Sequence, residues 1–277
     1  MRATSVLLSA VVLSGCGTME VGERNFLRPD KPGAAALPRL DVAAHLPAGT
    51  VRDEEIATAD GAVLRGISYR PAGAMRAVLY FGGNQFHLDQ HGASVLPLLA
   101  SCGSAVAVFD HRGYGRSSGQ PNLERMAADA VRAYDHMSAQ YPGGVIVHGQ
   151  SLGSIMAAYV AQRRPGAHGI VLESTTSNVQ EWVDANVPWY VALLGKVKVE
   201  PALRAVDNVR AMSSYRGAAL VLVGGADKVT PPSLARKVFD AIPGRRKQWH
   251  VAPGAGHNDT FGRTDVMPAY CKLVREA

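Results

Sequence analysis

Short apolar runs, separated by polar turns, recur along the chain after residue 50. Most are continuous stretches of about five residues, which is typical of strands covered on both faces. Two longer runs flank Asp60-Gly61, a pair that predicts a hairpin. The predicted strands are 52–58, 63–70, 77–81, 105–110, 145–148, 169–173, 218–223 and 248–251.

Segments with helical character lie between these strands. They are predicted at 88–100, 123–140, 152–163 and 233–242. Strands that alternate with helices indicate a mostly parallel sheet of about eight strands with helices on both faces, and the 52–70 hairpin adds an antiparallel part. We therefore expect one α/β domain over residues 51–277, with a small insertion at about 175–216.

Composition excludes several other classes of protein. The chain has 277 residues and is 47% hydrophobic, enough for a substantial core. Its net charge of +6 comes from scattered basic residues, so we expect no nucleic-acid partner. The three cysteines, at 16, 102 and 271, lack the paired spacing of zinc ligands. No metal and no organic cofactor are expected.

The N-terminus reads as a targeting segment. Arg2 precedes an apolar run over residues 3–13, too short to cross a bilayer, which ends in Leu13-Ser14-Gly15-Cys16. This tetrapeptide resembles the lipobox of bacterial lipoproteins. The resemblance implies a signal peptide at 1–15, a lipid on Cys16 that binds the membrane, and a cell-envelope protein facing the periplasm. The alternative is a simple secretory signal with a coincidental cysteine.

Residues 16–50 are rich in Pro, Gly and Ala and have no sustained period, so we expect a lipidated N-terminus and a tether without enzyme chemistry. Cys102 and Cys271 remain in the mature chain. An oxidising periplasm permits a disulfide between them, but two buried thiols fit the sequence equally well.

The candidate nucleophile is Ser151. The strand at 145–148 runs into Gly149-Gln150-Ser151-Leu152-Gly153 and then into a helix, the context of a nucleophile elbow. Gly115-Arg116-Ser117-Ser118-Gly119 matches the same G-x-S-x-G pattern. That second serine lies in a loop, however, with no helix directly after it, so context favours Ser151.

The candidate base and acid follow the nucleophile along the chain. Asp227 and His257 lie in loops just after predicted strands, in the order Ser, acid, His. Glu173, at the end of the preceding strand, is the competing acid. The histidines at 111, 148 and 250 are predicted to be packed or hydrogen-bonded structural residues.

Taken together, these segments resemble an α/β-hydrolase of the small serine hydrolase branch that includes membrane-associated acyl-protein thioesterases and esterases. The resemblance rests on Tyr80-Phe81-Gly82-Gly83-Asn84, the loop at 110–117, the Ser151 elbow, and the Asp227 and His257 loops. It implies that oxyanion-hole amides come from Leu152 and from Asn84 or its neighbour Gln85. The usual His-Gly pair is Gly82-Gly83 here. The resemblance also makes the Asp110-x-Arg112-Gly113 turn structural.

The expected activity is hydrolysis of a small acyl ester or thioester through an acyl-enzyme intermediate. The insertion resembles a small lid of one or two helices, and its Trp182 and Trp189 are candidates for binding substrate. Gln85, in the loop after the 77–81 strand, is a third candidate. The equally weighted alternative is that the aromatic residues only pack the insertion onto the domain. Peptidase or amidase activity on the same triad is one alternative. The other is a non-catalytic envelope lipoprotein that uses a hydrolase fold for binding.

Overall fold

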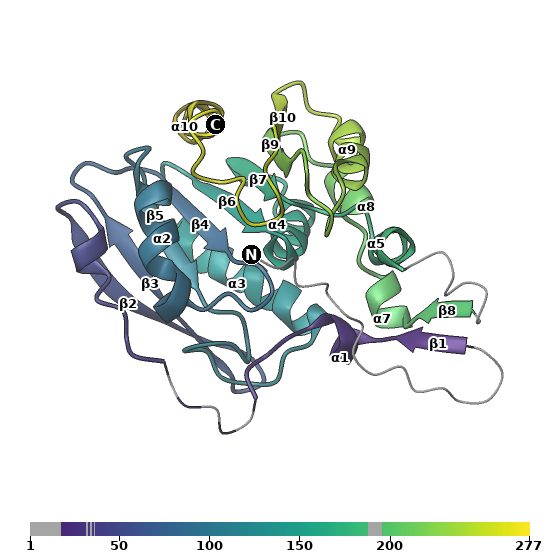
Figure 1. Cartoon of the computed structure of the whole chain (residues 1–277). Coiled ribbons are helices and arrows are strands. Elements are labelled where there is room, and N and C mark those ends of the chain that lie inside the picture. The colour runs from purple at the N-terminus through teal and green to yellow at the C-terminus, as the bar shows by residue number, and fades with distance from the viewer. Residues whose placement is uncertain (1–17, 32, 34, 36, 188–195) are drawn as a thin grey trace.

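The computed structural model describes residues 18–31, 33, 35, 37–187 and 196–277. Eight strands form one sheet in the order β10-β9-β7-β6-β4-β5-β3-β2 (Figure 1). Their bounds are β2 Thr50–Ala57, β3 Val63–Arg70, β4 Ala77–Phe81, β5 Ala105–Phe109, β6 Val145–Gln150, β7 Gly169–Glu173, β9 Ala218–Gly224 and β10 Lys247–Ala252.

The sheet is parallel from β5 to β10 and antiparallel at its other edge. β3 pairs antiparallel with both β2 and β5, and the β2–β3 hairpin turns at Asp60-Gly61 as predicted. All residues of β4, β5 and β7 are buried, which explains their continuous apolar sequences. The mostly parallel α/β sheet predicted from the alternation of strands and helices is confirmed.

Helices cover both faces of the sheet (Figure 1). Because successive side chains of a strand point to opposite faces, Leu79 joins the core cluster under α3, α4 and α9, whereas Val78 and Tyr80 join the cluster under α2 and α10. These helices are α2 Leu88–Ala100, α3 Leu123–Gln140, α4 Leu152–Arg163, α9 Pro232–Ala241 and α10 Met267–Glu276.

The insertion between β7 and β9 is more complex than the one or two helices predicted. Its described part contains α5 Val179–Asn186, β8 Lys196–Val199, α7 Pro201–Arg204 and α8 Asn208–Met212. Trp182 lies on α5, whereas Trp189 lies outside the described residues.

The N-terminal segment also has a structure that the sequence pattern misses. It contains β1 Thr18–Val21, α1 Glu23–Phe26 and a 3-10 helix, η1 Ala43–His45. β1 pairs in parallel with β8, and the Glu23 carboxylate accepts a hydrogen bond of 2.9 Å from the Leu123 amide at the start of α3. The prediction of a plain tether over residues 16–50 is therefore wrong for the part after Thr18. Cys16 lies outside the described residues.

A disulfide joins Cys102, just after α2, to Cys271 in α10, with the two Cα atoms 5.1 Å apart. This pairing decides between the two alternatives left by the sequence, and it ties the last helix to the face of the sheet that α2 covers. As to membranes, none of the helices in the described ranges combines the length and the apolar character needed for a span.

Candidate active site

Ser151 occupies the sharp turn between β6 and α4. Its backbone angles, φ +53° and ψ −114°, lie outside the regions that non-glycine residues usually adopt, which costs about 1–3 kcal/mol. The Ser151 amide donates a hydrogen bond of 2.9 Å to the Glu173 carbonyl on the neighbouring β7. This bond to the neighbouring strand fixes the turn, and the Ser151 hydroxyl lies at the carboxyl end of the parallel strands.

Two glycines make this turn sterically possible. A Cβ atom at Gly149 would lie 2.1 Å from the Gly153 carbonyl oxygen, and one at Gly153 would lie 1.9 Å from the Phe81 carbonyl oxygen. Both distances are far shorter than van der Waals contact. The pattern of glycines around Ser151 therefore reflects close approach of α4 to β4 and β6.

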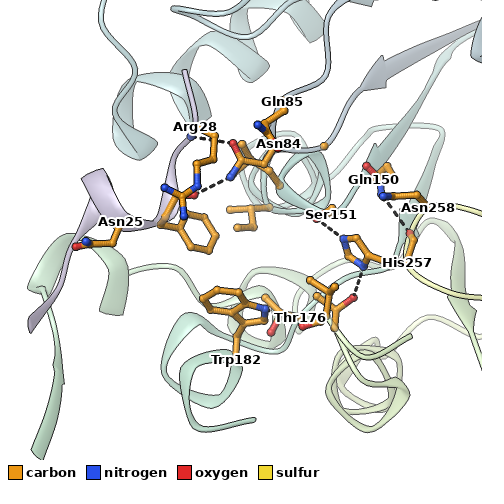
Figure 2. A pocket seen from close by; sticks show the side chains of 16 residues that line it. Asn25, Arg28, Asn84, Gln85, Gln150, Ser151, Thr176, Trp182, His257 and Asn258 are labelled. Atoms are coloured by element: carbon orange, nitrogen blue, oxygen red, sulfur yellow. Dashed lines mark hydrogen bonds between the residues drawn. The ribbon is translucent and has the colours of Figure 1, made fainter. Parts of the chain in front are cut away.

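His257 lies in the loop after β10 and contacts both of its predicted partners. Its Nε2 is 2.9 Å from Ser151 Oγ (Figure 2), and its Nδ1 is 2.9 Å from Asp227 Oδ2. The His257 side chain is 15% exposed and the Asp227 side chain is fully buried. The structure thus brings together an alcohol, an imidazole and a carboxylate in the arrangement that general-base catalysis requires.

The environment of Asp227 keeps its carboxylate ionised. Burial raises the pKa of Asp227, but hydrogen bonds from His257 and Thr230 outweigh burial and leave that pKa below its ordinary value. Oδ1 accepts from the amides of Val229 (2.8 Å) and Thr230 (2.9 Å), and Oδ2 lies 2.8 Å from Thr230 Oγ1. A fixed negative charge therefore faces the imidazole.

Thr230 and Ser174 complete the surroundings of His257, and sequence reasoning missed both. Thr230 Oγ1 lies 3.2 Å from His257 Nδ1, and the Ser174 hydroxyl donates 3.0 Å to the His257 carbonyl. The hydrogen bonds from the Val229 and Thr230 amides to the Asp227 carboxylate form an Asx-type turn. The short polar side chain of aspartate is suited to such a turn. An aspartate followed by this turn was the signal in the sequence that could have identified Thr230 as a neighbour of the triad. No sequence pattern pointed to Ser174.

The competing serine has a structural role. Ser117 Oγ donates 2.7 Å to the Asp110 carbonyl and accepts 2.9 Å from the Arg65 amide. These bonds fasten the loop after β5 to β3. Ser117 contacts neither His257 nor Asp227, so it lacks a base.

The competing acid is also engaged elsewhere. Glu173 Oε2 lies 3.1 Å from His148 Nε2, and Oε1 accepts 3.2 Å from the Phe261 amide. Both side chains of the Glu173–His148 pair are buried within the sheet. His111 Nε2 lies 2.8 Å from the Gly82 carbonyl oxygen. The side chains of Glu173, His148 and His111 support loops of the site, and none of these side chains bonds Ser151; Glu173 meets Ser151 through its backbone carbonyl alone.

The loop after β4 lies directly beside Ser151. A Cβ atom on Gly83 would be 3.4 Å from Ser151 Cβ, and Gln85 adopts a left-handed φ of +71°. Leu152 is the first residue of α4, where backbone amides have no partner within the helix. Leu152, Asn84 and Gln85 all line the same cavity as Ser151, the arrangement needed for the predicted oxyanion-hole donors.

The Asn84 side chain has a second role that the sequence does not reveal. Its Nδ2 donates 2.6 Å to the Phe26 carbonyl, and its Oδ1 accepts from the Arg28 amide (3.0 Å) and the Tyr114 hydroxyl (2.9 Å). We call residues 22–30 the N-terminal strap. Asn84 therefore joins the strap to the loop beside the nucleophile.

A cavity of about 540 Å³ opens in front of Ser151 (Figure 2). Trp182, held by a hydrogen bond of 2.9 Å from its Nε1 to the Val229 carbonyl, forms one wall and packs edge-on against Phe26 of the strap. The lining combines an apolar part with amide side chains: Asn25, Phe26, Arg28, Gly83, Asn84, Gln85, Gln150, Ser151, Leu152, Ile155, Thr176, Trp182, Val229, Thr230, His257 and Asn258.

In the described ranges, no three His, Cys, Asp or Glu side chains cluster as metal ligands. The groups that the site does assemble are a hydroxyl, a base, a buried carboxylate and candidate amide donors, beside a cavity large enough for a small organic substrate.

The sheet order, the elbow and the loops that follow β9 and β10 define the protein as an α/β-hydrolase. The sequence profile of the hydrolase family described as "Serine aminopeptidase, S33" matches residues 76–217, about half of the chain. The chain belongs to this family. The matched segment contains Ser151 and ends before Asp227 and His257.

Similar sequences come from bacteria and fungi. The uncharacterized protein Rv2307c of Mycobacterium tuberculosis is 32% identical over 82% of this chain and 78% of its own length. Protein bem46 of Schizosaccharomyces pombe is 23% identical over 66% of this chain and 62% of its own length.

Solved structures share the fold at low sequence identity. The esterase Pf2001 of Pyrococcus furiosus superimposes with a TM-score of 0.68 at 16% identity, covering 87% of this chain and 98% of the esterase. Acetyl xylan esterase 1 of Thermoanaerobacterium has a TM-score of 0.63 at 17% identity, covering 81% of this chain and 84% of its own. These similarities confirm the predicted α/β-hydrolase fold.

Proposed function

We propose that the protein is a serine hydrolase that cleaves a carboxylic ester or thioester through a Ser151–His257–Asp227 triad. The observation that carries the proposal is the position of His257, whose two ring nitrogens are each 2.9 Å from one partner. A histidine held between a hydroxyl and a buried carboxylate activates the hydroxyl as a nucleophile.

The mechanism follows from this geometry. Ser151 Oγ forms a bond to the substrate carbonyl carbon while its proton passes to His257 Nε2. The carbonyl oxygen becomes negatively charged, and the amides of Leu152 and of Asn84 or Gln85 are the proposed donors to it. The alcohol or thiol then leaves with the proton from His257. His257 then deprotonates a water molecule, whose oxygen adds to the acyl carbon; the bond from that carbon to Ser151 Oγ breaks, Oγ takes the proton back from His257, and the acid is released.

The lining of the cavity favours esters over the substrates of an aminopeptidase. An aminopeptidase must bind a free, positively charged amino group, for which a carboxylate is the usual partner. None of the described residues that line the cavity is Asp or Glu. Phe26, Leu152, Ile155 and Trp182 instead offer apolar surface to an acyl or alcohol group. The fold similarity to esterases of known structure agrees with this choice.

We also propose that the mature protein is attached to a bacterial envelope membrane by a lipid on Cys16 and faces the periplasm. The lipobox-like Leu13-Ser14-Gly15-Cys16 supports the anchor, and the Cys102–Cys271 disulfide is what an oxidising compartment favours. Cys16→Ala should move the protein from the membrane to the soluble fraction. Retention of the variant in washed membranes would contradict the anchor.

Catalysis is tested with a fluorophosphonate probe and a series of 4-nitrophenyl esters of increasing chain length. Ser151→Ala should abolish both labelling and turnover, because it removes the nucleophile. Ser117→Ala is the matched control from the second G-x-S-x-G segment and should keep labelling. Labelling that survives in Ser151→Ala and is lost in Ser117→Ala would overturn the proposal.

A further inference from the structure

Arg28 is the one Lys, Arg, Asp or Glu among the described residues that line the cavity. It is partly buried, and Figure 2 shows its side chain on the strap side of the cavity, near Asn84. Within the described ranges, its guanidinium forms no hydrogen bond and no ion pair, although its backbone is firmly held. The cavity therefore contains a positive charge without a protein partner.

Arg112 and Arg116, whose side chains are 3% and 9% exposed, are both paired with carboxylates. The Arg112 guanidinium lies 2.8 Å from Asp129 and 2.6 Å from Asp60. The Arg116 guanidinium lies 2.5 Å from Asp89. These pairs follow from the high cost of removing an unpaired charge from water. The Arg28 guanidinium, which is partly buried, has no such partner among the described residues, and Arg28 lines the cavity beside Ser151.

The strap holds Arg28 against the catalytic loop. The Arg28 amide donates 3.0 Å to Asn84 Oδ1 and 3.0 Å to the Tyr114 hydroxyl, and the neighbouring Leu27 side chain is buried. The Arg28 backbone is therefore fixed next to Asn84, the proposed oxyanion-hole residue, and Arg28 lines the cavity from that point.

The start of α4, next to Ser151, is a second source of positive potential. α4 begins at Leu152, and the amide groups at the start of a helix carry a partial positive charge. None of the described lining residues carries a carboxylate, so the lining itself offers a bound anion no like charge. An ester that carries an anionic group fits this field better than a neutral ester of the same shape.

We propose that Arg28 is a specificity-determining residue that binds an oxyanion of the substrate, a carboxylate or a phosphate, placed a few bonds from the scissile ester. Guanidinium suits both groups because its planar donors bind two oxygens at once. The inference rests on the proposed serine hydrolase function and adds the charge of the substrate to it.

The test compares pairs of substrates that differ only in charge. For an anion on the acyl side, the pair is 4-nitrophenyl hydrogen glutarate and 4-nitrophenyl pentanoate, which place a carboxylate and a methyl at the same position. For an anion on the alcohol side, it is 3-(pentanoyloxy)propyl phosphate and 3-hydroxypropyl pentanoate, followed by titration of the released acid. The measured quantity is the ratio of kcat/KM for the anionic over the neutral ester.

Wild-type enzyme should prefer the anionic ester of at least one pair, and Arg28→Gln should reduce that ratio by about tenfold, as expected for loss of one partly exposed charge contact. Arg28→Lys should keep part of the preference, and 0.5 M NaCl should weaken it. The pair that responds identifies on which side of the ester the anion lies. Arg24→Gln is the matched control, because Arg24 lies exposed on the same strap outside the cavity and should leave both ratios unchanged.

Three results would overturn the inference. They are a wild-type enzyme without preference for either anionic ester, an Arg28→Gln variant with wild-type ratios, and an Arg24→Gln variant with the same loss as Arg28→Gln. In each of these cases hydrolysis of neutral esters leaves the proposed function standing. If wild-type enzyme hydrolyses none of the esters faster than Ser151→Ala does, the proposed function itself fails, and the inference with it.

Discussion

Asp227→Asn provides the sharpest test of the triad, because the structure determines how the new amide must orient. Oδ1 accepts hydrogen bonds from the amides of Val229 and Thr230, so the asparagine carbonyl oxygen has to occupy that position. Its NH2 group then replaces Oδ2, 2.9 Å from His257 Nδ1. The Thr230 hydroxyl can accept from this NH2 while it donates to the Ser174 carbonyl 3.0 Å away, so the fold should be retained.

The consequence is a change of tautomer in the imidazole. An NH2 group donates to Nδ1, so the proton of neutral His257 moves to Nε2, which lies 2.9 Å from Ser151 Oγ. A protonated Nε2 cannot accept the serine proton. The expected loss in kcat is about 10⁴-fold, the size seen for the same change in a Ser-His-Asp protease, or about 5.5 kcal/mol of activation free energy.

The assay is steady-state hydrolysis of a 4-nitrophenyl ester, with thermal unfolding to verify the fold. Glu173→Gln is the control, because Glu173 bonds His148 and the Phe261 amide rather than His257. We expect it to lower kcat by less than about tenfold. A well-folded Asp227→Asn variant that loses less than about 100-fold, or a Glu173→Gln variant that loses as much as Asp227→Asn, would refute the reasoning.

Three further predictions concern stability and pH. Gly153→Ala should lower the free energy of unfolding by about 3 kcal/mol, because the added methyl would lie 1.9 Å from a backbone oxygen. Gly166→Ala is the control: its methyl meets nothing within 4 Å and should change the free energy of unfolding by less than about 1 kcal/mol. Equal effects of the two substitutions in urea unfolding would contradict the steric argument. Replacing both Cys102 and Cys271 with Ala should cost about 3–5 kcal/mol, because the bond links residues 169 positions apart in the unfolded chain; an unchanged Tm would show that the disulfide does not form. Despite burial, hydrogen bonds from His257 and Thr230 hold the pKa of Asp227 below its ordinary value of 3.8, so that carboxylate should stay ionised at every pH above about 5; a protonated Asp227 carboxyl band in infrared difference spectra above that pH, identified by its loss in Asp227→Asn, would contradict the assigned state.

Sequence alone determined the architecture and the position of the candidate nucleophile, because these depend on local patterns. A short apolar run such as 145–147, followed by a glycine-bounded turn and then a helix of small and apolar residues, admits few structures other than a buried strand, a turn and a packed helix. The order of Ser151, Asp227 and His257 along the chain, each after a strand, placed them at one edge of a parallel sheet.

Only the tertiary structure decided the contacts between distant segments. The bond from Asn84 to Phe26 joins residues 58 positions apart, and the disulfide joins residues 169 apart. A Pro- and Gly-rich segment without hydrophobic periodicity gives no sign of such contacts, so the sequence predicted that the strap would be part of a tether. The sequence already favoured Asp227 over Glu173 as the acid, but only the sheet shows what engages Glu173, because it places the buried His148 beside that carboxylate. Propensity and hydrophobic period act over a few residues, whereas the pairing of side chains across a fold depends on the packing of the whole chain.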